Sequence, residues 1–161
     1  MKLVVIADTH MPKKASSLPQ RLLEELPTAD LIIHAGDWQE KWVHEKLSHY
    51  GEVVGVYGNV DDEELHTQLP EHTIIEAGGF RIGLTHGHGD KKTTEKRVLE
   101  AFEGEELDCI IFGHSHLPLL RFVKKTMLFN PGSITDKRGL PFCSFGILTI
   151  DETIQAHHIF F

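Results

Sequence analysis

The sequence repeats one local pattern, in which a short apolar run is followed at once by Asp, Asn or His beside a glycine or a second polar residue. The pattern occurs in five segments: Asp8-Thr9-His10, Gly36-Asp37, Gly58-Asn59-Val60-Asp61, His86-Gly87-His88 and Gly113-His114-Ser115-His116. Mixed oxygen and imidazole ligands suit Mn, Fe, Zn, Co or Ni better than Mg or Ca, which favour all-oxygen shells. The residue types therefore indicate a transition-metal site.

Spacing within the segments gives a reason to group these side chains. In an extended chain, residues two apart point to the same side, so each Asp-x-His or His-x-His segment is predicted to present two ligands in one direction. Neighbouring glycines would allow sharp turns and a close approach of the backbone to a metal. These glycines are Gly36, Gly58, Gly87 and Gly113. The absence of cysteine from the group argues against a structural zinc site of the thiolate type.

The elements that must position these residues are short. Runs rich in Val, Ile and Leu predict buried strands at residues 3–7, 31–35, 53–57 and 109–112. Helical patterns are predicted at 18–26, where Ser17 is the expected N-cap, and at 40–49 and 93–102. Hairpins or paired strands are predicted at 73–77 with 80–85, within 119–129, and at 142–150 with 153–159.

This order of elements predicts an α/β fold, a four-layer αββα sandwich in which two mixed β-sheets pack face to face with helices outside. In open α/β sheets, ligand-binding groups gather beyond the C-terminal ends of the strands. The five polar segments lie at such ends, which predicts that they meet at one rim. The turn Asn130-Pro131-Gly132-Ser133 is expected to act as a scaffold for that rim, without a catalytic role.

Length and composition limit the class of protein. The 161 residues, of which 40% are hydrophobic and 25% charged, predict one globular domain over 1–161. The formal net charge of -8 argues against strong nucleic-acid binding, because the overall field repels phosphate backbones. No apolar run is long enough to span a membrane. Cys109 and Cys143 lie in apolar surroundings, which indicates reduced thiols and a cytoplasmic location.

With these motifs in this order, the sequence resembles the calcineurin-like metallophosphoesterase superfamily, specifically its small bacterial and archaeal phosphodiesterase branch. The resemblance runs along essentially the whole chain and includes the segment Asn130-Pro131-Gly132-Ser133. It implies that Asp8, His10, Asp37 and His116 hold one metal ion. It also implies that Asp37, Asn59, His86 and His114 hold a second, so that Asp37 bridges the two.

The resemblance further implies a dinuclear phosphoric diester hydrolase, in which a metal-bridging hydroxide attacks phosphorus in line. The expected cofactor is a pair of divalent transition-metal ions, with manganese in first place and nickel, iron, zinc or cobalt as alternatives. The expected partner is a small phosphodiester substrate, with no membrane, and a homo-oligomer is left open. Asp37 is the expected central catalytic residue because it alone touches both ions.

One position departs from the wider superfamily, where a His follows the Asn ligand and is thought to contact phosphate or protonate the leaving group. This chain has Val60 there. General acid assistance is worth about 10²- to 10⁴-fold in rate, so slow turnover of poor leaving groups is expected. His88 or Asp61 could take over this role.

The alternative from another class is a non-catalytic protein-interaction scaffold of the same fold, similar to the retromer-subunit branch. That branch departs from the metal-ligand pattern, whereas every expected ligand is present here. Two further residues keep two readings each. His34 is expected to be a hydrogen-bonded core residue, with a role as metal ligand as the second interpretation. Trp38 is expected either to line the site or to pack in the core.

Overall fold

The computed structural model describes residues 1–161, which form two β-sheets and four α-helices. The strands are β1 (Lys2–Ile6), β2 (Leu31–Ala35), β3 (Val53–Val56), β4 (His72–Ala77), β5 (Phe80–Thr85), β6 (Cys109–Ile111), β7 (Leu119–Val123), β8 (Thr126–Asn130), β9 (Ser144–Ile150) and β10 (Ile154–Phe160). The helices are α1 (Gln20–Leu23), α2 (Trp42–Ser48), α3 (Glu63–Gln68) and α4 (Thr94–Ala101), and a 3₁₀ turn covers Leu26–Thr28.

Each sheet has five strands and mixes parallel with antiparallel pairs. The first sheet has the order β10-β9-β1-β2-β3, in which β1, β2 and β3 run parallel and β9 is antiparallel to β1. The second sheet has the order β4-β5-β6-β8-β7, in which β5, β6 and β8 run parallel. Parallel strands end at the same edge of their sheet, so the loops that follow β1, β2, β3, β5 and β6 are brought together.

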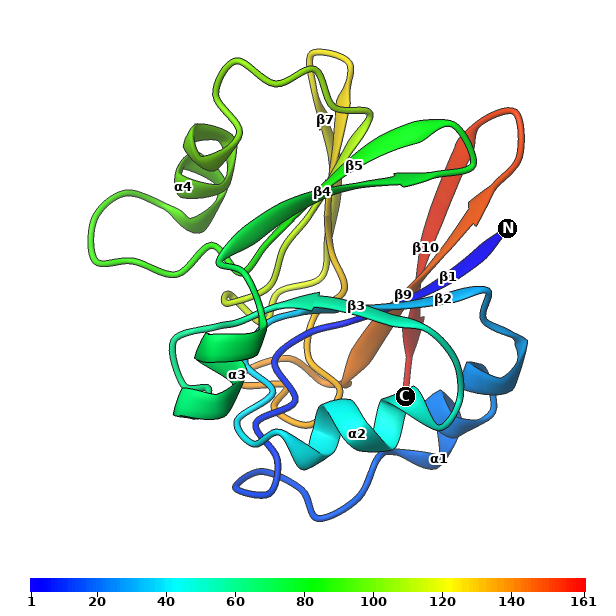
Figure 1. The fold of residues 1–161 in the computed structure, drawn as a ribbon, viewed down its shortest axis with the longest axis vertical. Coiled ribbons are helices and arrows are strands. Elements are labelled where there is room, and N and C mark those ends of the chain that lie inside the picture. The colour runs from blue at the N-terminus through cyan, green and yellow to red at the C-terminus, as the bar shows by residue number, and fades with distance from the viewer.

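Alternation along the strands separates the layers. In β1, Leu3 and Val5 contribute to a core between the two sheets, whereas Val4 and Ile6 face a second core. This second core includes apolar residues of α1, α2 and α3. A third core packs α4 on the outer face of the second sheet. Figure 1 shows α1, α2 and α3 against the first sheet and α4 beyond the second. The predicted four-layer sandwich with two mixed sheets is confirmed.

Helix boundaries differ most from the prediction. The expected helix at 18–26 divides into α1 and a separate 3₁₀ turn, and its N-cap is Pro19 without a side-chain hydrogen bond, so the Ser17 cap is wrong. Helix α3 was not predicted. Its N-cap Asp62 accepts a hydrogen bond from the Leu65 N–H at 2.9 Å. The acidic first turn and the four-residue spacing of Leu65 and Leu69 are the signals that identify it.

None of these helices combines the length and the apolar character that crossing a bilayer requires.

Candidate metal centre

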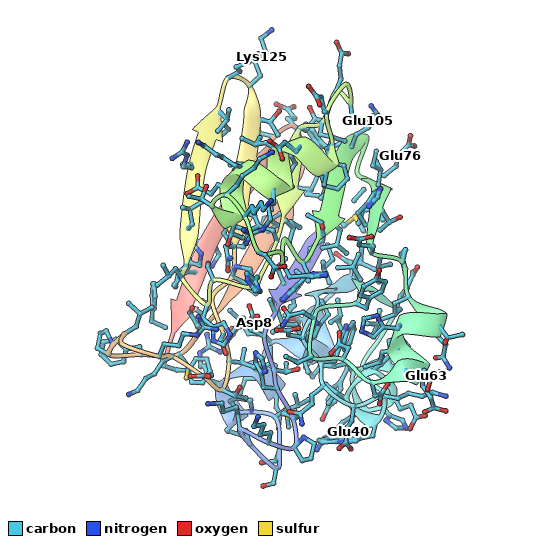
Figure 2. All side chains as sticks on the ribbon, turned by 90° about the vertical axis from the view of Figure 1, so that its left-hand side faces the viewer. Asp8, Glu40, Glu63, Glu76, Glu105 and Lys125 are labelled. Carbon is cyan, nitrogen blue, oxygen red and sulfur yellow. The ribbon has the colours of Figure 1, made fainter.

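The five polar segments meet at one edge of the sandwich. The segments follow β1, β2, β3, β5 and β6, which belong to two facing sheets. Asp8 is separated from the end of β1 by Ala7 alone and is completely buried. Figure 2 shows Asp8 in the middle of the molecule, whereas labelled residues such as Glu63 and Glu105 lie at its periphery. The rim predicted from the strand ends is therefore formed, with a carboxylate at its centre.

The side chains gather in two groups of three. Ligand atoms of Asp8, His10 and His116 all lie within 4.8 Å of one another, and we call this group the first triad. Ligand atoms of Asp37, His86 and His114 do the same, and we call this group the second triad. Each triad has one carboxylate and two imidazoles, a donor set that suits a divalent transition metal.

Asp37 lies between the two triads. Its Oδ2 is 3.2 Å from His86 Nε2 in the second triad and 3.5 Å from His10 Nε2 in the first. Its Oδ1 accepts a hydrogen bond from the Val60 N–H at 3.1 Å. This position fits the bridging role that the family resemblance implies.

Asn59 joins the second triad from the loop after β3. Its Oδ1 lies 3.1 Å from Nδ1 of His114. Both residues are more open to solvent than Asp37 and His86. All seven predicted ligands are thus in one place, and the second group carries the neutral amide.

Hydrogen bonds behind the ligands orient the imidazoles. Nδ1 of His86 donates to the carbonyl of Ala35 at 2.7 Å, and Nδ1 of His116 donates to the carbonyl of Asp136 at 2.8 Å. The Nε2 atoms are thereby directed to the centre, where those of His10 and His116 lie 3.2 Å apart. Carbonyl partners of this kind fix the tautomer of metal-binding histidines.

Two buried atoms at the centre test whether a metal fits. Asp8 Oδ2 is buried without a hydrogen-bond partner, and His86 Nε2 is buried without an aligned hydrogen bond although Asp37 Oδ2 lies 3.2 Å away. Buried polar atoms in proteins are almost always paired, so each unpaired one needs an explanation. Cations held by the two triads would supply the missing partners, and the donor set present fits two such ions.

The carboxylates of the two triads have opposite pKa shifts. Burial raises the pKa of Asp8 to about 8, against the lowering effect of the His86 charge. Burial also acts to raise the pKa of Asp37, but the His86 imidazole and the Val60 N–H outweigh it and lower the value to about 2. Without metal, Asp8 is therefore protonated at neutral pH and Asp37 is ionised.

The pKa values of the imidazoles also shift in opposite directions. Burial lowers the pKa of His86, but its contact with Asp37 and the charges of both carboxylates raise the value to about 9. Burial and the His86 charge lower the pKa of His114 to about 4. Burial lowers the pKa of His116 to about 4 despite its hydrogen bond to Asp136. His114 and His116 are neutral at pH 7 and have lone pairs ready for a metal.

The backbone of five ligands is left-handed, which corrects the explanation drawn from an extended chain. The φ angles are 53° at Asp8, 46° at His10, 59° at Asp37, 66° at His114 and 59° at His116. The prediction that an extended chain points residues two apart to the same side is therefore wrong as the explanation of how the ligands converge. One predicted pair shares a triad, whereas the other is divided between the two. Strained residues of this kind cost about 1–3 kcal/mol each and concentrate at functional sites.

Two of the predicted glycines leave room for ligands. A Cβ on Gly36, whose φ is +87°, would lie 2.7 Å from His86 Nδ1. A Cβ on Gly58 would collide with the carboxylate of Asp37. Any larger residue at either position would displace a second-triad side chain.

The two candidates for proton transfer differ in their surroundings. His88 lies beside the second triad, with its ring centroid 5.5 Å from that of His86, and its Nδ1 is buried without a partner. Asp61 accepts backbone N–H groups on both oxygens, from Gln39 at 2.6 Å and from Gly58 at 2.7 Å. Burial raises the pKa of Asp61, which favours the acid form. Catalytic roles for both residues stay predictions.

His34 and Trp38 belong to the core behind the site. Trp38 is completely buried, and its indole N–H donates to the Val56 carbonyl at 2.8 Å. His34 stacks on Trp38 with ring centroids 3.6 Å apart, and its Nε2 is 3.2 Å from Thr9 Oγ1. Packing is therefore the role of Trp38, and His34 is a hydrogen-bonded core residue outside both triads.

Sequence reasoning missed the contacts made by Thr135 and Asp136. Their loop was expected to be a scaffold, but nothing in the local sequence showed that Thr135 Oγ1 donates to the Thr9 carbonyl at 2.7 Å. The Asp136 carbonyl that orients His116 was likewise invisible. The only signal is the position of both residues just after Asn130-Pro131-Gly132-Ser133.

The calcineurin-like phosphoesterase superfamily domain matches residues 1–153, nearly the whole chain. The chain belongs to this superfamily. A probable metallophosphoesterase of Methanocaldococcus jannaschii is 34% identical to this protein over 97% of this chain and 79% of its own. A probable metallophosphoesterase of Methanothermobacter thermautotrophicus is 36% identical over 99% of this chain and 92% of its own.

Solved structures have the same fold as this member of the superfamily. Vps29 of Entamoeba histolytica, in a structure complexed with zinc, has a TM-score of 0.75 at 26% identity and covers 99% of both chains. A structure described as a novel archaeal phosphodiesterase has a TM-score of 0.77 at 21% identity and covers 100% of both chains, which shows the fold alone. The protein is thus a member of a metallophosphoesterase family with two candidate metal-binding groups.

Proposed function

We propose that this phosphoesterase is a phosphodiesterase that uses two divalent transition-metal ions to hydrolyse a small phosphodiester. The observation that carries the proposal is the pair of triads with Asp37 between them, within 3.5 Å of an imidazole of each. Two neighbouring metal sites joined by one carboxylate are the arrangement that in-line displacement at phosphorus uses.

The residues would divide between the two ions as the triads do. Asp8, His10 and His116 would hold one ion and His86, His114 and Asn59 the other, with Asp37 shared. Bound there, the ions would supply Lewis acidity toward phosphate oxygens and a water nucleophile of lowered pKa. Only two of the seven side chains are carboxylates, so the charge of the ions is half neutralised and an anionic diester is attracted.

The neighbourhood of Val60 determines which leaving groups are favoured. Val60 is 40% exposed, and its side chain carries no proton donor where the wider superfamily has a histidine. Burial lowers the pKa of His88, which disfavours the protonated imidazole that a general acid needs. The neutral ring can still donate an N–H hydrogen bond to phosphate. We therefore expect activated aryl diesters to be better substrates than alkyl diesters.

The net charge of -8 supports a small substrate over a nucleic acid. A long polyanion would meet a repulsive field over most of the surface, whereas a small diester needs only the local positive centre. A cytoplasmic location and a homo-oligomer are part of this proposal.

The test is hydrolysis of a bis-aryl phosphate by metal-stripped protein supplied separately with Mn, Ni, Fe, Zn or Co. We expect diester hydrolysis with at least one of these ions, with manganese as the first choice. The active protein should contain two bound ions per chain. The corresponding aryl monoester serves as the comparison substrate and should be hydrolysed more slowly. Absence of diester hydrolysis with every divalent metal contradicts the proposal.

The alternative is a protein-interaction scaffold of this fold. The Vps29 structure of Entamoeba histolytica supports it through the shared architecture, and the zinc in that structure supports zinc as a candidate ion for this fold. The complete set of seven side chains and the unpaired atoms of Asp8 and His86 support the hydrolase more strongly. Metal binding without hydrolysis of any diester in a broad panel would favour the scaffold.

A further inference from the structure

Asn130, the last residue of β8, and the loop 131–136 that follows it carry none of the predicted ligands but contact the two segments that form the first triad. Asn130 Nδ2 donates to the carbonyl of Gly113 at 2.8 Å, at the start of the segment that contains His116. Ser133 Oγ donates to the carbonyl of Asp8 at 2.7 Å. The loop therefore reaches the segments after β6 and β1, which supply all three residues of the first triad.

The hydroxyl of Ser133 has its hydrogen bonds completely assigned. Ser133 is 1% exposed, and its Oγ accepts the N–H of Asp136 at 2.9 Å and of Thr135 at 3.3 Å. A hydroxyl has one proton and two acceptor positions. Because both acceptor positions are used, the single proton is directed to the Asp8 carbonyl. This hydroxyl thus fixes the backbone of a buried ligand from 125 residues away.

Thr135 adds a second hydroxyl to the same backbone. Its Oγ1 donates to the Thr9 carbonyl at 2.7 Å and lies 3.4 Å from the Asp8 carbonyl. The segment it contacts has left-handed φ angles at Asp8 and His10. Such angles persist only where surrounding contacts enforce them. The two hydroxyls supply contacts of this kind.

The second triad is held differently. Nδ1 of His86 is fixed by the Ala35 carbonyl of β2, and Oδ1 of Asp37 by the Val60 N–H. Neither contact involves residues 130–136. Asn130 also contacts the segment that carries His114 of the second triad, through the Gly113 carbonyl. The hydroxyls of Ser133 and Thr135, in contrast, contact only the ligand segment that contains Asp8 and His10. A change at Ser133 or Thr135 should therefore reach the first triad and leave the second in place.

We propose that Ser133, with Thr135, is a positioning residue for the first of the two metal sites. The inference rests on the proposed function only in requiring that the protein bind two ions. Loss of an outer partner of a metal ligand costs about 10- to 100-fold in affinity. In Ser133→Ala, the ion at the first triad should weaken by that factor while the ion at the second triad keeps its affinity.

The experiment is titration of metal-stripped protein with Mn²⁺, followed by calorimetry and electron paramagnetic resonance. At two equivalents of Mn²⁺ per chain, wild type should bind two ions and give the spectrum of a coupled pair. Ser133→Ala should bind one ion tightly and give the spectrum of isolated Mn²⁺. Thr135→Val should shift the same way to a smaller extent, and Thr135→Ser, which keeps the hydroxyl, should restore the wild-type result.

Ser144→Ala is the matched control, because Ser144 is equally buried and its hydroxyl donates to the Pro131 carbonyl at 2.8 Å on the same loop. It should lose stability without separating the two sites. Two tight ions in Ser133→Ala, or equal weakening of both sites, overturns the inference, as does the same site-selective loss in Ser144→Ala. Wild-type protein that binds two ions but hydrolyses no diester contradicts the proposed function and leaves this inference standing.

Discussion

The two ends of the sandwich differ in the burial and the pairing of their charged side chains. The end opposite the metal centre has a cavity of about 730 Å³ lined mainly by charged residues. There Arg81 pairs with Glu105 at 2.8 Å, and Asp108 accepts the backbone N–H of Arg81 at 2.8 Å. Glu105 and Asp108 are exposed, and Arg81 is half-buried. At the metal end, Asp8 and His86 are buried with unpaired atoms. Figure 2 shows the contrast, with Glu105 at the top and Asp8 inside.

This difference shows that a cavity lined by charged residues does not by itself mark the functional site in this protein. Exposed ion pairs contribute about 0–1 kcal/mol and require no special backbone. The metal end instead combines unpaired buried atoms with left-handed backbone at five ligand positions, both of which are costly. A site that receives cations and substrate is the arrangement that accounts for both costs.

The largest expected effect comes from removing the shared carboxylate. Asp37→Asn should lower diester hydrolysis by at least about a thousandfold, or about 4 kcal/mol in the barrier, because both metal sites lose a ligand. Asp108→Asn, the matched change at the opposite end, should leave the rate within about twofold, since its contacts are local and exposed. Steady-state rates and metal content measure both. Comparable losses in the two variants would erase the distinction between the ends.

The next effect is a gain. Val60→His should accelerate hydrolysis of diesters with poor alkyl leaving groups by about a hundredfold and change aryl diesters little, because assistance to the leaving group matters most when that group is basic. Phe122→His, at another exposed apolar position 60% accessible on β7, should have no effect. A rate unchanged on every diester in Val60→His would remove Val60 as the cause of slow turnover.

The smallest expected effect is a release of protons when the metal ions bind. Metal binding needs the deprotonated forms of Asp8 and His86, whose pKa values in the metal-free protein are about 8 and about 9. Below these values both groups hold a proton, so loading two ions near neutral pH should release about two protons, and affinity should rise with pH until His86 is neutral. Calorimetry in buffers of different ionisation enthalpy measures the release. A value near zero would show that these buried groups are already deprotonated.

Much of the fold could be predicted from local sequence. The predicted strands at 31–35 and 80–85 coincide with β2 and β5. The first is an apolar run that ends before Gly36, and the second alternates apolar residues after the turn Gly78-Gly79. The position of polar residues directly after buried strands located the five polar segments, and the family resemblance then implied which seven of their side chains are ligands. Their convergence followed from the parallel order of the strands.

What could not be predicted depends on contacts distant in sequence. The hydrogen bond from Ser133 to Asp8 joins residues 125 positions apart, and no local pattern marks it. The left-handed backbone at Asp8 and His10 is enforced by such contacts, so the sequence alone pointed to extended chain instead. Helix α3 was missed for another reason, since it is only six residues long and follows the ligand loop closely.

The position of β1 within its sheet has a consequence for how the chain folds. β1 lies between β2 and β9, and Val5 pairs with Ile33 on one side and with Gly146 on the other. During synthesis the N-terminal half can form the parallel strands, but one edge of β1 stays open until the last hairpin leaves the ribosome. Such late, distant pairing slows folding and exposes an apolar strand edge to aggregation in the meantime. Nascent chains of this protein would thus keep one unpaired edge of β1 until β9 is available to pair with it.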